Sequence, residues 1–292
     1  MKKISVITDN YGGISQEEAS KYDVKILSMP FFIGEECVYE GVSITREAFF
    51  EKLNSGEQVS TSQPSPESVM NIWREGLAEA ETVLYMPLSS GLSSSCNTAM
   101  MLAREDEFEG KVFVVDIGRI STPMHRSILD ALELIEEGYS AKEIKDILEA
   151  SKDQMSIYIA VETLEHLKRG GRITPAAAAV GALLNIKPIL SLNVGVLDSY
   201  QKCRGIKKAK REMLAAMKQD FETKFRESYE RGEIYLLAAS SADAETTSAW
   251  VEEIKEHFPG MEVLCDPLCF GIVCHTGEGA LGIGCSCKPK RV

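Results

Sequence analysis

Four short segments of this sequence gather side chains that can donate hydrogen bonds to an anion. The first, Thr61-Ser62-Gln63-Pro64-Ser65-Pro66, places hydroxyl groups ahead of a helix start that contains proline. A hydroxyl there either caps the helix or donates to a ligand. The second, Leu88-Ser89-Ser90-Gly91-Leu92-Ser93-Ser94-Ser95, joins a predicted strand to a predicted helix. The free N–H groups at such a helix start can hold an anionic head group, and an ordinary capped Gly-Ser turn is the alternative.

The other two segments add a guanidinium and an imidazole. In residues 162–173, the pair Gly170-Gly171 ends a short amphipathic helix, and Arg172 follows at a sharp exit. Arg172 either donates to the site or braces the turn. In residues 274–280, His275 and Thr276 precede a Gly-x-Gly turn that lets the backbone approach a ligand. A histidine after an apolar strand, here residues 270–273, is often structural, but its neighbours favour a role in binding.

A catalytic interpretation of the same residues stays open. Ser93 and His275 can serve as nucleophile and base of a stand-alone acyl hydrolase, with Asp9 or Asp116 orienting the imidazole. However, Ser93 is not part of a G-x-S-x-G elbow, and the chain has neither a P-loop nor a G-x-G-x-x-G turn after its first strand. The sequence therefore favours binding over catalysis.

Eight cysteines, five of them within the last 28 residues, raise the question of a metal site. No C-x-x-C pair occurs, although zinc sites usually use that spacing. Buried free thiols are the expected state, and a zinc site that uses Cys285 and Cys287 is the alternative. Neither a metal nor a cofactor is expected.

The charge balance and the apolar runs exclude other classes of protein. Lysine and arginine number 32 against 44 acidic residues, and the net charge of −12 repels nucleic acid over most of the surface. The apolar run in residues 1–10 is too short for a signal peptide, so a cytoplasmic location is expected. The weakly polar stretch at residues 175–197 contains Asn185, Lys187 and Pro188, which are costly in hydrocarbon, and is not expected to span a membrane.

Short β-branched runs alternate with segments of helical period, a pattern typical of α/β proteins. Strands are predicted at residues 4–8, 24–32, 82–88, 112–116, 156–161, 187–192, 234–240 and 263–267. Helices are predicted at residues 65–80, 94–107, 123–137, 141–152, 207–228 and 244–257. The length of 292 residues suggests two α/β domains, residues 1–153 with a mostly parallel, Rossmann-like sheet and residues 154–292 with a second α/β layer.

Six motifs, taken in their order along the chain, resemble the DegV family. They are Thr8-Asp9 after the first strand, TSQPS at 61–65, LSSGLS at 88–93, TLEHLKRGGRI at 163–173, LLNIKPIL at 183–190 and HTGEGALG at 275–282. The resemblance implies two α/β domains with one long-chain fatty acid, such as palmitate or oleate, bound between them. It further implies a carrier without catalytic activity that presents the fatty acid carboxylate to the catalytic subunit of fatty acid kinase, which makes the acyl phosphate.

Carried over by residue, the resemblance assigns the carboxylate contacts to six side chains: Thr61, Ser62, Ser93, His275, Thr276 and Arg172. Glu278 departs from the proline usual in the family and brings a negative charge near this group. The basic cluster at residues 202–211 is either a solvated helix start or a surface for the partner, and the resemblance points to Arg204 as a kinase contact. The expected partners leave room for transient membrane contact and exclude nucleic acid.

Overall fold

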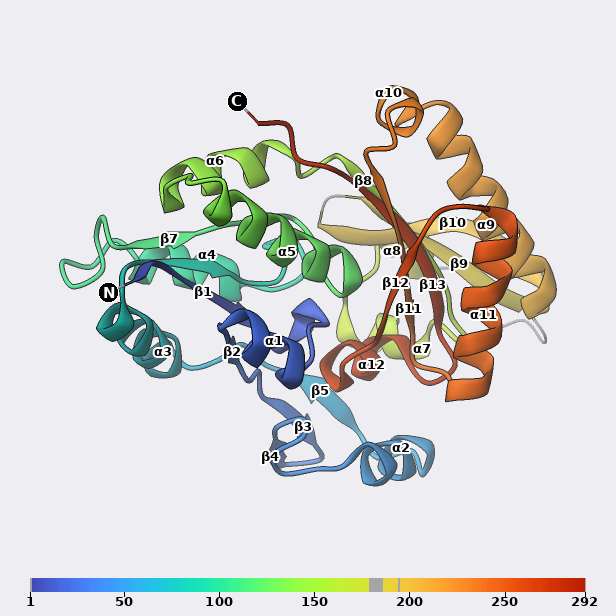
Figure 1. The fold of residues 1–292 in the computed structure, drawn as a ribbon. Helices are drawn as coiled ribbons and strands as arrows, with labels where there is room; N and C mark the ends of the chain where they lie inside the picture. Colours follow the sequence, from blue (N-terminus) through green and yellow to red (C-terminus); the bar gives the residue numbers. More distant parts are fainter. Residues whose placement is uncertain (1, 179–185, 194, 292) are drawn as a thin grey trace.

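The computed structural model describes residues 2–178, 186–193 and 195–291 of the chain. Two large sheets, each covered by helices, lie side by side, and a smaller three-stranded sheet lies below them in Figure 1. Within the described residues, no helix combines the length and the apolarity needed to cross a bilayer. Part of the 175–197 stretch and the first three residues of the expected LLNIKPIL motif lie outside the described residues.

The first large sheet is parallel throughout and has the strand order β2-β1-β6-β7. Its strands are β1 (Lys2–Asp9), β2 (Val24–Leu27), β6 (Ala80–Met86) and β7 (Val112–Val114). Apolar runs of this kind, buried between helices, are typical of parallel sheets. The helices of this half are the 3-10 turn η1 (Asn10–Gly12), α1 (Gln16–Tyr22), α3 (Pro66–Glu79), α4 (Ser95–Leu102), α5 (Thr122–Glu136) and α6 (Ala141–Ala150). The predicted parallel sheet is confirmed.

The second large sheet is mixed and has the order β10-β9-β8-β13-β11-β12, in which only β11 and β12 pair in parallel. Its strands are β8 (Met155–Ala160), β9 (Ile186–Asn193), β10 (Val196–Arg204), β11 (Ile234–Ser240), β12 (Val263–Pro267) and β13 (Leu281–Cys287). The helices of this half are α7 (Glu165–Gly170), α8 (Pro175–Ala178), α9 (Ile206–Glu222), α10 (Arg226–Glu230), α11 (Ala244–His257) and α12 (Phe270–Thr276). The two predicted α/β layers are therefore present.

The third sheet, β4-β3-β5, forms a small unit with α2. This β3–β5 unit consists of β3 (Phe31–Ile33), β4 (Glu36–Val38), α2 (Arg46–Asn54) and β5 (Val59–Thr61). Its Phe49 ring stacks on Phe270 of α12 with the ring centres 4.4 Å apart, and the Glu40 carboxylate accepts a hydrogen bond of 2.9 Å from the Phe270 N–H. These contacts bring the end of β5 against α12.

Three predictions made from local patterns are wrong. Residues 24–32 do not form one strand, because the chain leaves β2 before Pro30, which lacks an N–H and has a fixed φ, and enters β3 in another sheet. The apolar run at 270–273 is helical, since a short buried run has the same appearance in a strand and in a helix. Lys202 and Arg204 belong to β10 rather than to a helix start. Strands β10 and β13 were not predicted.

Buried polar contacts attach the start of α5 to the second sheet. Arg119, in the loop that follows β7, donates to Ser286 Oγ of β13 at 2.7 Å and to the Ser151 carbonyl at 2.9 Å. Thr122 donates to the Ala238 carbonyl of β11 at 2.7 Å. The loop before α5 therefore lies against the second sheet. The predicted boundary between residues 153 and 154 falls between α6 and β8 and stays a prediction.

Candidate functional site

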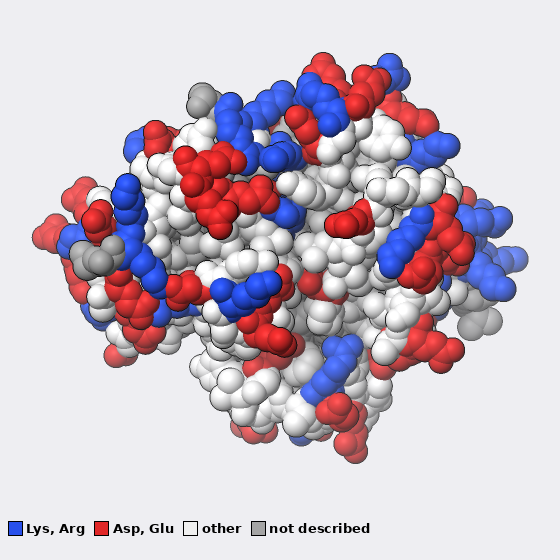
Figure 2. All heavy atoms as spheres, in the orientation of Figure 1, with Lys and Arg blue, Asp and Glu red and all other residues white. Residues whose placement is uncertain are grey.

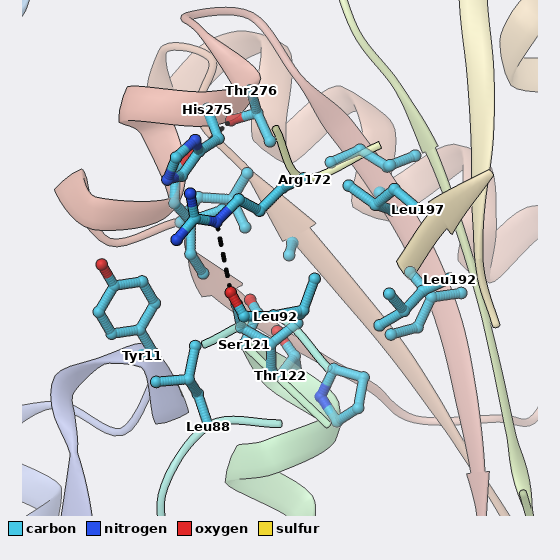
Figure 3. A pocket seen from close by; sticks show the side chains of 18 of the residues that line it. Tyr11, Leu88, Leu92, Ser121, Thr122, Arg172, Leu192, Leu197, His275 and Thr276 are labelled. Atoms are coloured by element: carbon cyan, nitrogen blue, oxygen red, sulfur yellow. Dashed lines mark hydrogen bonds between the residues drawn. The ribbon is translucent and has the colours of Figure 1, made fainter. Parts of the chain in front are cut away.

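A cavity of about 390 Å³ lies between the two large sheets. This volume falls in the range of roughly 300–1,000 Å³ that is usual for small-molecule sites. Residues of the first half reach it from η1, from β5 and from the loops after β6 and β7, and residues of the second half reach it from α7, α12 and the face of the mixed sheet. Polar side chains gather at one end, and most of the remaining lining is apolar, with Ser121 and Thr122 as polar exceptions (Figure 3). The cavity is therefore amphipathic.

All six side chains assigned to the carboxylate line this one cavity: Thr61, Ser62, Ser93, Arg172, His275 and Thr276. They come from segments up to about two hundred residues apart, and the fold brings them together because β5 packs against α12. Thr61 Oγ1 and His275 Nε2 are 2.9 Å apart and form a hydrogen bond. Figure 3 shows His275, Thr276 and Arg172 at one side of the cavity and Leu192 and Leu197 at the other.

His275 is neutral at physiological pH. Burial, together with the positive charges of Arg172 and His166, lowers its pKa to about 4. The imidazole packs so tightly on Gly170 that a Cβ at this glycine would lie 2.0 Å from its Nδ1. That Nδ1 is buried and has no hydrogen-bond partner in the described part of the chain. A neutral imidazole can hydrogen-bond a head group without adding a second cation.

Arg172 brings a positive charge to the polar end. Its Nε donates to the Leu92 carbonyl at 3.3 Å (dashed line in Figure 3), and its Nη1 donates to the Gly170 carbonyl. In residues 2–178, 186–193 and 195–291, no carboxylate lies within ion-pair distance of this guanidinium. A partly buried cation whose protein partners are neutral carbonyls favours an anion in the cavity beside it.

The hydroxyl groups differ in how free they are. Ser93 Oγ accepts from the Ser95 N–H at 3.2 Å, which leaves its own O–H to donate. Thr276 is 3% exposed and donates to the carbonyls of Ile272 and Gly277. Ser62 is exposed and donates to the Gln63 carbonyl at 3.2 Å. Of these three hydroxyls, Ser93 is therefore the one that can donate to a ligand without losing another bond.

Ser65 shows that the capping interpretation of the first segment also holds. Its Oγ accepts from the Ser68 N–H at 3.1 Å and caps α3. The segment 61–66 thus divides between two roles, because Thr61 and Ser62 lie at the cavity while Ser65 caps the helix.

Tyr11 is a polar cavity residue that the sequence did not reveal. It is 6% exposed and lines the cavity, and burial raises the pKa of its phenol well above the ordinary value. A Cβ at Gly271 of α12 would lie 2.1 Å from its hydroxyl oxygen, so the ring fits only because that helix residue is glycine. Nothing in the local sequence links residue 11 with residue 271.

The apolar part of the cavity was also not predicted from sequence. Most of it is the face of the mixed sheet, with contributions from β8, β9, β10, β11 and β13: Ile157, Ile159, Leu192, Leu197, Leu237, Ala239, Gly282 and Gly284. Leu88, Leu92 and Ile120 cover it from the first half. A period-2 pattern signals a half-buried strand but does not say what its buried face will meet.

The relay needed for a serine hydrolase is not assembled. The Asp9 carboxylate accepts from the N–H groups of Tyr11 and Leu88, at 3.0 and 2.8 Å. Asp116 pairs with Lys152 at 2.7 Å and accepts from the Ser90 hydroxyl. Because the Nδ1 of His275 is unpartnered and its Nε2 bonds Thr61, neither acid orients this imidazole and Ser93 is not its hydrogen-bond partner.

The late cysteines are free thiols dispersed over several elements. Cys285 and Cys287 lie on β13 with their side chains in the core beneath α9 and α11, and burial raises the pKa of the Cys287 thiol. No group of three or more His, Cys, Asp or Glu residues in the described segments is arranged to hold a metal ion.

Two charged features named in the sequence lie outside the cavity. Glu278 is exposed and accepts from the Asn54 amide at 2.8 Å, so its charge points away from the polar end. Arg204 is exposed at the end of β10, and Figure 2 shows lysine and arginine side chains gathered at the right-hand edge, over β10 and α9. Lys210 of the basic cluster instead pairs with Glu253 at 3.0 Å.

Comparison with known proteins gives a consistent result. The family model described as an uncharacterised protein of the DegV family matches residues 3–288. A DegV domain-containing protein of Clostridium perfringens is 30% identical over 290 residues, with 97% of each chain covered. A solved structure of a fatty-acid-binding DegV family protein from Thermus thermophilus has a TM-score of 0.85 and 32% identity, over 98% of this chain and 99% of the other. DegV from Bacillus subtilis, a fatty acid binding protein, has a TM-score of 0.82 and 27% identity, over 99% and 100%.

Proposed function

This chain belongs to the DegV family, and we propose that it binds one long-chain fatty acid in the cavity between its two sheets. In this proposal, the carboxylate lies among Arg172, Ser93 and the Thr61–His275 pair, and the hydrocarbon tail lies on the mixed sheet. The protein is a carrier, and a separate kinase phosphorylates the exposed carboxylate. Its relatives from Thermus thermophilus and Bacillus subtilis are fatty-acid-binding proteins, which supports the proposal.

The observation that carries the proposal is the combination of Arg172 with an apolar slot. A guanidinium whose protein partners are two backbone carbonyls favours a single anionic group, because a carboxylate forms charge-assisted hydrogen bonds with it. The surrounding donors are neutral, since His275 has a pKa of about 4. The apolar sheet face on the other side matches a long hydrocarbon tail.

The tail supplies most of the affinity. Burying about 14 methylenes at roughly 0.8 kcal/mol each gives on the order of 11 kcal/mol before ordering costs are subtracted. A hydrogen bond to a charged group contributes about 1.5–3 kcal/mol before desolvation. The polar end therefore mainly determines which end of the ligand faces the partner. Neutral donors can form hydrogen bonds with an acyl phosphate as well as with a carboxylate.

Lipid analysis tests the binding directly. Natively purified protein, extracted and measured by mass spectrometry, should contain near-stoichiometric fatty acid. Arg172→Ala should lower the affinity for palmitate roughly 10- to 150-fold, because it removes the charge-assisted bonds. Arg169→Ala is the matched control, since Arg169 is exposed three residues earlier. A protein that is empty and takes up neither palmitate nor oleate would refute the proposal.

The kinase partnership has its own test. Arg204→Ala should keep the bound lipid, because Arg204 is not a cavity residue, and should weaken stimulation of a cognate fatty acid kinase. Stimulation equal to wild type would assign the basic cluster to an ordinary solvated surface.

A hydrolase is the competing function, and the contacts of His275 count against it. It predicts acyl-ester cleavage without a partner, abolished in Ser93→Ala. The carrier predicts instead that this variant holds fatty acid less tightly and that neither protein turns over an ester.

A further inference from the structure

The last strand, β13, presents two different faces. Its larger side chains pack in the core beneath α9 and α11, and these are Leu281, Ile283, Cys285 and Cys287. Since side chains alternate across a strand, Gly282 and Gly284 share the opposite face. Both glycines line the cavity. A strip of bare backbone therefore runs along the cavity face of this strand.

Side chains of the two neighbouring strands stand on either side of this strip. Gly284 pairs with Ile157 of β8 and with Leu237 of β11. In the next row toward α12, Gly282 is flanked in the same way by Ile159 and Ala239. Because these four neighbours also line the cavity, the two glycines form the floor of a trough with aliphatic walls.

At Gly282 neither the backbone nor the neighbouring strands require glycine, so the missing side chain leaves space above the floor. Neither Gly282 nor Gly284 has a positive φ, so the backbone would accept a side chain at both positions. A Cβ at Gly282 would have its three nearest neighbours at 3.4–3.9 Å, all of them atoms of the adjacent strands. At Gly284 the nearest is the Ser156 carbonyl oxygen of β8, at 3.0 Å. A side chain at residue 282 would thus extend into the cavity.

The trough lies between two polar groups, His275 before the start of β13 and the Ser286–Arg119 pair beyond Gly284. Strand β13 starts a few residues after His275 and runs away from it, so Gly284 lies about 7 Å deeper than Gly282. The next residue on this face is Ser286, which is buried and accepts the hydrogen bond from Arg119 at 2.7 Å. This buried polar pair closes the strand face to hydrocarbon beyond Gly284.

We propose that the glycine strip of β13 is the floor on which the acyl tail lies, and that the empty positions at Gly282 and Gly284 determine how long a tail the protein accepts. This inference rests on the proposed function. Each methylene that loses its place should lower affinity about fourfold. Bulk at Gly284 removes space from the end of a long tail, and bulk at Gly282 removes space nearer the head group.

Chain-length selectivity tests the assignment. Dissociation constants for laurate, palmitate and stearate are measured with delipidated wild type, Gly284→Ala and Gly282→Val. Gly284→Ala should weaken stearate about fourfold and leave laurate within about twofold of wild type. Gly282→Val adds three carbon atoms and should weaken stearate on the order of 50-fold, so that the tightest-binding acid becomes a shorter one.

A change on the opposite face of the same strand is the control. Cys285→Ala shortens a side chain in the core beneath α9 and α11 and should leave the ratio of stearate to laurate affinity as in wild type. Far-UV circular dichroism and urea unfolding establish that each variant is folded. Gly282→Ala, whose Cβ meets only ordinary contacts, replaces Gly282→Val if the valine variant does not fold.

The outcomes separate this inference from the proposed function. Wild type that binds none of the three acids would refute fatty acid binding itself. Wild type that binds them, with folded glycine variants that keep its stearate-to-laurate ratio, would overturn the tail assignment and leave the function standing. An equal loss of affinity for all three acids in both variants would also overturn it, since the two positions would then not determine which chain length binds best.

Discussion

The protonation of His275 links the polar end of the cavity to the stability of the fold. Its pKa is 6.5 when unperturbed and about 4 in the folded protein, mainly because the imidazole is buried. This difference corresponds to about 3 kcal/mol. Above pH 6.5 the imidazole is neutral in both the folded and the unfolded state and costs nothing. As the pH falls from 6.5 to 4, the unfolded chain binds a proton that the folded protein rejects, so the free energy of unfolding decreases.

Urea unfolding of fatty-acid-free protein between pH 4 and pH 7 measures this effect. The free energy of unfolding of wild type minus that of His275→Gln should fall by about 3 kcal/mol over this range. Other groups with shifted pKa values, such as Asp9, are present in both proteins and cancel from the difference. His257→Gln is the control for the loss of a histidine side chain outside the cavity, because His257 is exposed.

Binding of the ligand should reverse the shift. A carboxylate close to His275 favours the protonated imidazole, so saturation with palmitate should raise its pKa. The Cε1 proton resonances of the four histidines, assigned with the two variants, follow this titration by NMR. If the free energy of unfolding had the same pH dependence in wild type and in His275→Gln, and if the His275 imidazole titrated near pH 6.5, the claim that His275 is buried and neutral at the cavity would be refuted.

Further predictions concern the packing around the cavity and in the core of the first half. Gly170→Ala should reduce palmitate affinity at least tenfold in a fluorescence displacement assay, because the new Cβ would lie 2.0 Å from the His275 Nδ1 and displace the ring; unchanged affinity would show that the ring position is irrelevant to binding. Gly91→Ala places a Cβ 2.0 Å from the Cα of Gly195. It should therefore separate the serine-rich loop at residues 88–95 from the β9–β10 turn and increase the rate of palmitate release in stopped-flow exchange. Trp73→Ala should lower the free energy of unfolding by about 3–5 kcal/mol in urea, since the ring is fully buried against Tyr85 and Phe108; a loss below about 1 kcal/mol would contradict this packing.

Local sequence carried the information for elements that depend on near neighbours. The strand that became β1, the proline-started helix α3 with its Ser65 cap, and the alternation of strands and helices follow from periodicity and capping, which act over a few residues. Clusters of donors, such as Ser93 in its serine loop and His275 beside Thr276, are visible for the same reason. Arg172 was located because two glycines end the helix in front of it.

Contacts between distant residues were decided by the tertiary structure. The hydrogen bond between Thr61 and His275 depends on the packing of the β3–β5 unit against α12. The contact between the Tyr11 ring and Gly271 likewise joins residues far apart in the sequence. The trough of β13 depends on the pairing of β13 with β8 and β11 in the mixed sheet. The alternation of side chains along β13 is compatible with any half-buried strand and does not specify these neighbours. Pairing and packing energies are summed over residues far apart in the chain, so a local pattern shows that a face will be buried and leaves its partner undefined.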